Sequence, residues 1–179
     1  MDWNSVIDHY YPSGRRVRDI LLNHSRKVAD YALEIAHSHS LPLSDEEIET
    51  AAMLHDIGII ATDAPDIDCR GTEPYLAHGI VGAEMLRKLG VDEKYAFVAE
   101  RHTGSGLTNE EIDAEGLPLP KDRSYMPQTL LEKLICYADC FYSKGGDMNR
   151  KPIERVRRSM ARFGEGVAQR FEELHKQFQ

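Results

Sequence analysis

Residues 44–60 read SDEEIETAAMLHDIGII, and this stretch decides how the rest of the chain is interpreted. Ser44 and Glu47 form a capping-box pattern, which predicts that a helix begins here. The spacing of the apolar residues that follow is helical and continues to the neighbourhood of Asp56. His55 therefore lies in line with the apolar face of this helix, and an acidic residue follows it directly.

Apolar residues recur at a period close to 3.6 through most of the remaining chain, which is typical of amphipathic helices. Helices are expected at residues 3–10, from Ser13 through Ile35, at 78–89, at 92–102, from Thr108, at 130–144 and, as a pair, at 152–178. Two irregular stretches, 61–75 and 103–128, separate them. With no convincing strand pattern, the sequence predicts an all-α fold, a single bundle-like domain.

Length and charge narrow the class of protein. The 179 residues suit one domain, and 41% hydrophobic residues are enough for a buried core. The 22 Lys and Arg against 30 Asp and Glu give a net charge of −8, which repels a nucleic-acid backbone unless the basic residues cluster. The chain shows no leader pattern and no run of about eighteen apolar residues. A cytoplasmic protein without a nucleic-acid or membrane partner is expected.

Polar side chains occupy the apolar faces of five expected helices. They are His24, His55, His78, His102 and Asp139. One inward histidine is usually an ordinary core residue, but a buried carboxylate is costly unless a cation or hydrogen-bond donors face it. Together with Asp56, the five are explained most economically by a metal site inside the bundle. Mixed imidazole and carboxylate ligands favour Fe, Mn, Co or Zn over an all-oxygen Mg or Ca site.

These residues also resemble a known signature. His24, the His55-Asp56 pair and Asp139 are similar to the H...HD...D pattern of the HD-domain metal-dependent phosphohydrolase superfamily. The resemblance spans about residues 15–144 and implies a helical HD fold. The activity that it implies is hydrolysis of a phosphate ester.

The segments around two further histidines resemble the binuclear branch of that superfamily. His78 is followed by glycine and His102 follows arginine, as in a small subgroup of stand-alone HDIG proteins. The same branch includes HD-GYP phosphodiesterases, but this chain has Ile59 and Ile60 where they carry lysine, and the GYP motif is missing. A small nucleotide or another phosphate ester is therefore a better expected substrate than a cyclic dinucleotide.

The resemblance implies a division of labour among the ligands. One divalent transition metal ion would be held by His24, His55, Asp56 and Asp139. Asp56 would bridge to a second ion, held also by His78 and His102. Two such ions polarise a phosphoryl oxygen and lower the pKa of a bridging water, so His55 and Asp56 belong to the catalytic centre and no protein nucleophile is needed.

Two basic residues are candidates for stabilising the extra negative charge of the transition state. Arg101 lies beside a ligand, and Lys144 lies one to two turns beyond Asp139. A solvated surface charge is the alternative for each of them. Arg26, Lys27 and Lys133 flank the ligand helices as well.

The sequence therefore predicts one HD domain over residues 1–179, with its core at about 15–144 and the helices at 152–178 packed on it. The expected function is a metal-dependent phosphohydrolase acting on a nucleotide or a similar small phosphate ester. Two alternatives stay open. One is a mixed-valence di-iron oxygenase, because some relatives of the HD fold use the same six ligands for oxygen chemistry. The other is a non-catalytic sensor of metal or nucleotide. A homodimer is compatible with the sequence.

Overall fold

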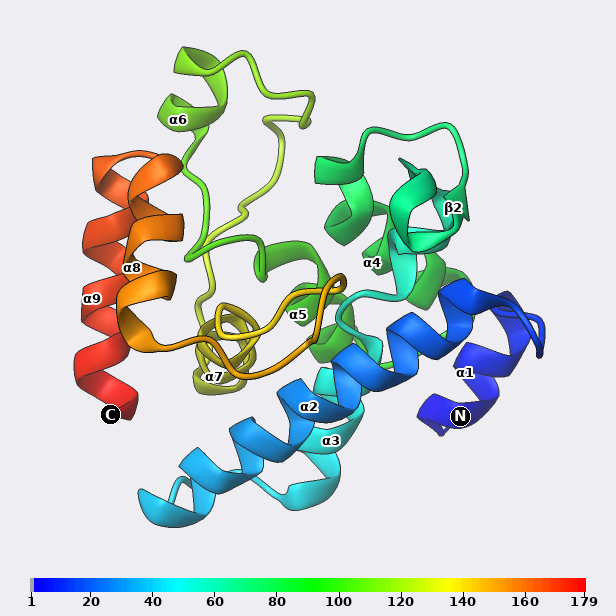
Figure 1. The fold of residues 1–179 in the computed structure, drawn as a ribbon, viewed down its shortest axis with the longest axis horizontal. Coiled ribbons are helices and arrows are strands. Elements are labelled where there is room, and N and C mark those ends of the chain that lie inside the picture. Colours follow the sequence, from blue (N-terminus) through cyan, green and yellow to red (C-terminus); the bar gives the residue numbers. More distant parts are fainter. Residues whose placement is uncertain (1) are drawn as a thin grey trace.

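The helical periodicity of the sequence is realised as nine α-helices in the computed structural model, which describes residues 2–179 (Figure 1). They are α1 (Trp3–Tyr10), α2 (Arg16–Ser38), α3 (Asp45–Leu54), α4 (His78–Lys88), α5 (Glu93–Arg101), α6 (Asn109–Ala114), α7 (Leu130–Asp139), α8 (Ile153–Arg162) and α9 (Glu165–Phe178). The predicted all-α class is confirmed. Among these helices, none is both long enough and apolar enough to cross a membrane.

The stretch between α3 and α4 is more ordered than its sequence indicates. It contains three short 3-10 helices, η1 (Ile57–Ala61), η2 (Pro65–Ile67) and η3 (Tyr75–Ala77). Between them β1 (Asp63–Ala64) pairs antiparallel with β2 (Cys69–Arg70). The expectation of no strand misses this hairpin because two-residue strands are too short to show a period-two pattern.

Capping residues set most of the helix boundaries. Both bonds of the Ser44–Glu47 capping box are present at the start of α3, and Thr108 with Glu111 forms a second box at α6. The predicted cap at Ser13 is wrong: α2 begins after Arg15, whose side chain makes no capping bond.

The expected helix at 130–144 is too long. The amides of Cys140, Phe141 and Tyr142 donate to the carbonyl groups three residues earlier, so the chain tightens after Asp139 and leaves the helix.

Two groups of buried apolar residues form the core and meet at the middle of α2. Val28 and Ala32 belong to the first group, which includes residues of α3, α7, α8 and α9. Val17 and Leu21 belong to the second, which includes residues of α1, η1, α4 and α5. His24 therefore lies at the junction of the two groups. Figure 1 shows α8 and α9 at one end of the molecule and α1 at the other.

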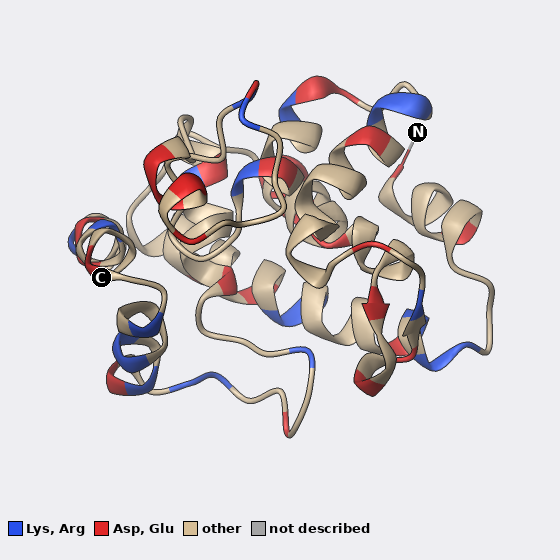
Figure 2. Ribbon diagram, turned by 90° about the horizontal axis from the view of Figure 1, so that it is seen from above, with Lys and Arg blue, Asp and Glu red and all other residues tan. Residues whose placement is uncertain are grey.

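The charged residues are unevenly placed despite the net charge of −8. Residues 144–162 hold seven basic and two acidic side chains. Figure 2 shows this basic segment as the loop that leads into α8 and α8 itself, whereas acidic residues are scattered over the other helices. The chain after Asp139 is thus a local basic region.

Candidate metal centre

The six residues predicted as ligands converge in one place. Each comes from the start or end of an element or, for His24, from the middle of α2. The ligand atoms of one group lie within 4.8 Å of one another, and so do those of a second group. The first group is His24, His55, Asp56 and Asp139, and the second is Asp56, His78 and His102. All are buried except Asp139, whose side chain is 18% exposed. That residue marks the side on which the cluster meets solvent.

Asp56 belongs to both groups, and its two carboxylate oxygens face different histidines. Oδ2 lies 3.1 Å from Nε2 of His24 and 3.1 Å from Nε2 of His55. Oδ1 lies 3.3 Å from Nε2 of His78 and 3.3 Å from Nε2 of His102. A carboxylate in this position is arranged as a bridge between two sets of ligands.

Backbone carbonyl groups orient three of the histidines. Nδ1 of each ring lies 2.6–2.7 Å from the carbonyl oxygen three residues earlier in the chain. The pairs are His55 with Ala52, His78 with Tyr75, and His102 with Ala99. Because a carbonyl oxygen only accepts hydrogen bonds, Nδ1 carries a proton in each ring, and Nε2 is the nitrogen that faces the cluster and can ligate a metal once it is unprotonated.

The atoms turned inward lack hydrogen-bond partners. Within residues 2–179, both ring nitrogens of His24, Nε2 of His55 and both carboxylate oxygens of Asp56 are buried without a hydrogen bond of acceptable geometry. Leaving such groups unsatisfied is costly, and a divalent cation with imidazole and carboxylate ligands would satisfy them. The donor set therefore fits a transition metal.

Burial and charge shift the protonation of the ligands in different directions. Burial lowers the pKa of His78 to about 3, so this ring is neutral and free to ligate. Burial also acts to lower the pKa of His55, but the carboxylates of Asp56 and Asp139 outweigh it and raise that pKa to about 10. Burial opposes ionisation of Asp56, yet His55 and Lys144 hold its pKa well below the usual range. The centre thus keeps its carboxylates ionised and attracts positive charge.

Lys144 reaches the cluster although α7 ends before it. Its Nζ lies 2.6 Å from Oδ2 of Asp56, and its side chain is 12% exposed. Tyr75 completes this side of the centre: its ring stacks on His78 at 4.9 Å between centroids and lies 5.8 Å from the Lys144 ammonium. Sequence reasoning missed Tyr75, because the stretch that contains it has no periodicity, and only its place three residues before His78 sets it apart.

The Arg101 side chain pairs with Glu132 and not with a residue of the cluster. Its Nη1 lies 3.1 Å from Oε2 of Glu132, and its guanidinium lies 3.9 Å from the ring centroid of Phe97. Glu132 is buried and also accepts hydrogen bonds from the amide of Gln128 and the hydroxyl of Thr129. The structure therefore places Arg101 in a pair that links α5 to α7, and its catalytic role stays a prediction. A Thr-x-x-Glu spacing at the start of α7 is the signal that singles out Glu132.

Two of the other flanking basic residues, Arg26 and Lys27, have partners of their own. Arg26 pairs with Glu49 at 2.6 Å, and Lys27 donates to the carbonyl oxygen of Met148 at 2.8 Å. Among the flanking basic residues, Lys144 is the one for which the described part of the chain shows a contact with Asp56.

Comparison with known families agrees with this geometry. The HD domain family matches residues 21–143, a range that contains all six residues of the cluster. The chain belongs to the HD domain family. The matched range includes the turn after Asp139 and ends at residue 143, directly before Lys144.

Three curated relatives show what the chain is similar to. The uncharacterized protein MJ0778 of Methanocaldococcus jannaschii is 41% identical over 122 residues, 66% of this chain and 64% of that protein. Two proteins named tRNA (cytidine(56)-2'-O)-methyltransferase are also similar. The one from Picrophilus torridus is 33% identical over 75% of this chain and 35% of its own length. The one from Thermoplasma volcanium is 32% identical over 98% of this chain and 46% of its own length.

The chain thus spans less than two thirds of the length of each of these relatives. No solved structure matches the chain.

Proposed function

We propose that this HD domain is a metal-dependent phosphohydrolase that acts on a nucleotide or a related small phosphate ester. The observation that carries the proposal is the position of Asp56, whose oxygens each face a separate pair of histidines at 3.1–3.3 Å. Membership of the HD domain family supports it. Two divalent ions held by these residues would supply a Lewis acid for the phosphoryl oxygen and lower the pKa of a water molecule.

The remaining groups of the chain favour an anionic substrate. The Lys144 ammonium pairs with Asp56, its side chain is 12% exposed, and it would be available to a phosphate that binds at the centre. The basic segment 144–162 continues from it and would attract an anion over a longer range. The carbonyl groups that bind Nδ1 of His55, His78 and His102 keep these rings oriented, so that the site needs little rearrangement when it is loaded.

The methyl-transfer activity in the names of two relatives does not extend to this chain. The matched region is 35% and 46% of those proteins, so each has more than half of its length outside the match. A di-iron oxygenase would use the same ligands, and the experiment below separates the two chemistries. Hydrolysis is favoured because Lys144 and the basic segment are suited to a phosphate group.

The test is phosphate release by protein loaded with Mn or Co under strict anaerobiosis, screened over nucleotides and sugar phosphates. A hydrolase turns over without oxygen, because its ions serve as Lewis acids only. Asp56→Ala should abolish turnover, whereas the matched change Asp66→Ala at an exposed position should leave it intact. Turnover that needs iron and consumes oxygen in proportion to product, without phosphate release, would show that the oxygenase alternative is correct.

A further inference from the structure

Four arginines lie along α8, and three of them share one face of the helix. Arg155, Arg158 and Arg162 are spaced i, i+3 and i+7, which places them on the same side. All three are exposed, whereas Val156 and Met160 are buried and attach the helix to the core. Because a helix rises 1.5 Å per residue, these three residues, the arginine stripe, extend over about 10 Å.

The arginine stripe differs from the rest of the basic segment in having no partner. The four other basic residues of 144–162 are engaged within the domain: Lys144 by Asp56, Arg150 by Glu34, Lys151 by two backbone carbonyl groups, and Arg157 by Glu154 and Glu172. Among residues 2–179, no carboxylate lies within ion-pair distance of Arg155, Arg158 or Arg162. Their charge is therefore available to an anion outside the domain.

The net charge of −8 opposes a polyanionic partner, but it is not spread evenly. Segment 144–162 carries seven basic and two acidic side chains, and Figure 2 shows α8 as mainly basic. At physiological ionic strength exposed charges are screened beyond about 8 Å, so an anion at α8 interacts mainly with the arginine stripe. The charge of the whole chain argues against a nucleic acid only where the basic residues do not cluster, and on α8 they do.

An exposed aromatic ring directly follows the arginine stripe. Phe163 is 62% exposed, and the other large hydrophobic side chain exposed among residues 2–179 is Tyr75, at 38%. Arg162 and Phe163 both line a hollow of about 370 Å³, whose apolar walls include Leu117 and Val167. None of the six ligand residues of the metal centre lines this hollow. The stripe and the ring thus form a surface separate from the centre.

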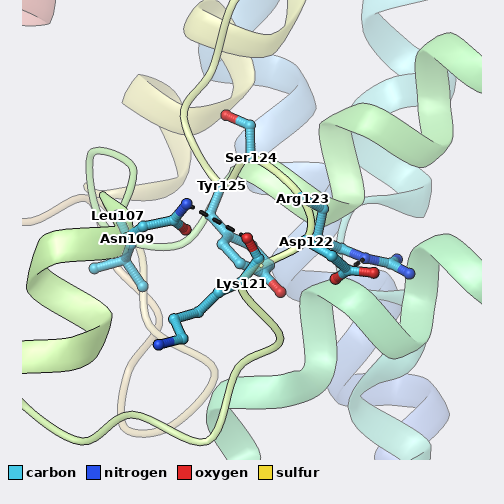
Figure 3. A pocket seen from close by; sticks show the side chains of 7 residues that line it. All are labelled: Leu107, Asn109, Lys121, Asp122, Arg123, Ser124 and Tyr125. Atoms are coloured by element: carbon cyan, nitrogen blue, oxygen red, sulfur yellow. Dashed lines mark hydrogen bonds and ion pairs between the residues drawn. The ribbon is translucent and has the colours of Figure 1, made fainter.

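A second hollow contains basic residues that are not available. Figure 3 shows its lining, which consists of Leu107, Asn109 and residues 121–125. The Lys121 ammonium pairs with Asp113 at 2.6 Å, and Arg123 pairs with the buried Glu100 at 2.9 Å. Because these charges are compensated within the domain, this hollow carries no inference about a ligand.

We propose that the arginine stripe and Phe163 bind a single strand of nucleic acid, with its phosphates on the arginines and a base on the ring. Guanidinium groups match phosphate oxygens bidentately, and base stacking on an aromatic ring beside a basic surface is how proteins bind single strands. A single strand offers phosphate and unstacked base together, whereas a duplex keeps its bases stacked inside. The proposal does not depend on the metal centre or on the reaction proposed for it.

The test is fluorescence anisotropy of the full chain with labelled oligo(U) and oligo(dT) of about twelve nucleotides. Three phosphate contacts give a slope of about −2 for log K against log salt concentration with a single strand. Changing all three arginines of the stripe to glutamine should weaken binding at least about tenfold at 50 mM salt and bring the slope toward zero. The tighter of the two strands identifies RNA or DNA as the ligand, and either supports the proposal.

The matched control is a single exposed arginine at the other end of the molecule. Arg158→Gln should reduce the slope by about 0.7, because one phosphate contact is lost. Arg16→Gln, at the start of α2 and also exposed, should leave both affinity and slope unchanged. An equal effect of the two changes would mean that net charge, and not the arginine stripe, controls binding.

The role of the ring is tested separately. Phe163→Ala should weaken binding of oligo(U) at least about fivefold without changing the slope, since stacking is lost and no charge is removed. An abasic strand of the same length should bind the parent protein more weakly than oligo(U) by a similar factor. The proposal is overturned if the abasic strand, an oligoglutamate peptide or vesicles of anionic lipid bind as tightly as oligo(U), or if the parent protein binds neither strand.

Discussion

Nε2 of His78 lies 3.0 Å from Nε2 of His102, and both rings use Nδ1 to bind a backbone carbonyl group. Two lone pairs therefore face each other inside the protein, with Oδ1 of Asp56 at 3.3 Å from each nitrogen. Neutral imidazoles in this position repel unless a proton or a metal ion lies between them. Burial holds the pKa of His78 at about 3, so a proton is disfavoured near neutral pH and a metal ion is the expected occupant.

The first prediction is that the protein purifies with about two transition-metal ions per chain. Because ions bind the folded state and not the unfolded chain, removing them with a chelator should lower Tm, and adding Mn, Fe, Co or Zn should restore it. Elemental analysis with thermal unfolding measures both effects. Protein that contains no metal and shows no thermal shift with any of these ions would contradict the metal centre itself.

The second prediction separates the two ligand groups. His78→Ala or His102→Ala should reduce the metal content toward about one ion per chain, because each removes one of three ligands of the second group. His37→Ala, at an exposed histidine paired with Asp45, is the control and should keep the metal content of the parent protein. Two ions and full activity in both cluster variants would mean that the second group does not bind metal.

The third prediction concerns the pH dependence of the metal-free protein. The pKa of His78 falls from 6.5 to about 3 on folding, so its contribution to stability is lost as pH falls from 6.5 toward 3. The pKa of His55 rises from 6.5 to about 10, so its contribution is present below 6.5 and is lost as pH rises toward 10. The free energy of unfolding should therefore be greatest near pH 6.5.

Bound metal should abolish the loss of stability between pH 6.5 and about 10, because a His55 that ligates a metal holds no proton on Nε2. Thermal unfolding between about pH 4 and pH 10, with a chelator and with Mn, measures the change. A metal-free protein equally stable at neutral and alkaline pH would show that Asp56 and Asp139 do not act on His55 in this way.

The fourth prediction is that Arg101 contributes to stability through Glu132. Both side chains are largely buried, at 10% and 3% exposure, so Arg101→Met should lower the free energy of unfolding by about 3 kcal/mol. The exposed pair Arg26–Glu49 is the matched control, and Arg26→Met should cost less than about 1 kcal/mol. Urea unfolding measures both. If Arg101→Met abolishes turnover but leaves stability unchanged, the residue acts at the reaction centre and not in this link.

Local patterns explain why the helices and the ligands could be predicted. The Ser44–Glu47 and Thr108–Glu111 boxes are contacts within one helical turn, and the structure contains both. Five of the six ligands share a face with apolar neighbours on their own helix, and the sixth, Asp56, directly follows one of them. When those faces pack together, the inward polar groups meet, so the convergence on Asp56 follows from helical periodicity.

Contacts between distant segments could not be predicted in the same way. The pairing of Arg101 with Glu132 joins residues 31 positions apart, and neither residue has a local feature that names the other. Lys144 reaches Asp56 only because α7 ends at Asp139 and the following turns redirect the chain. An expected helix through residue 144 predicts a different direction for this side chain.

The central claim is that Asp56 bridges two metal ions, and anomalous diffraction from crystals of Mn- or Zn-loaded protein tests it most directly. The account predicts two anomalous peaks about 3.5–4 Å apart, one beside each carboxylate oxygen of Asp56. The first peak should lie among His24, His55 and Asp139, and the second between His78 and His102. A single peak in the first group, with His78 and His102 still facing each other without an ion, would contradict it.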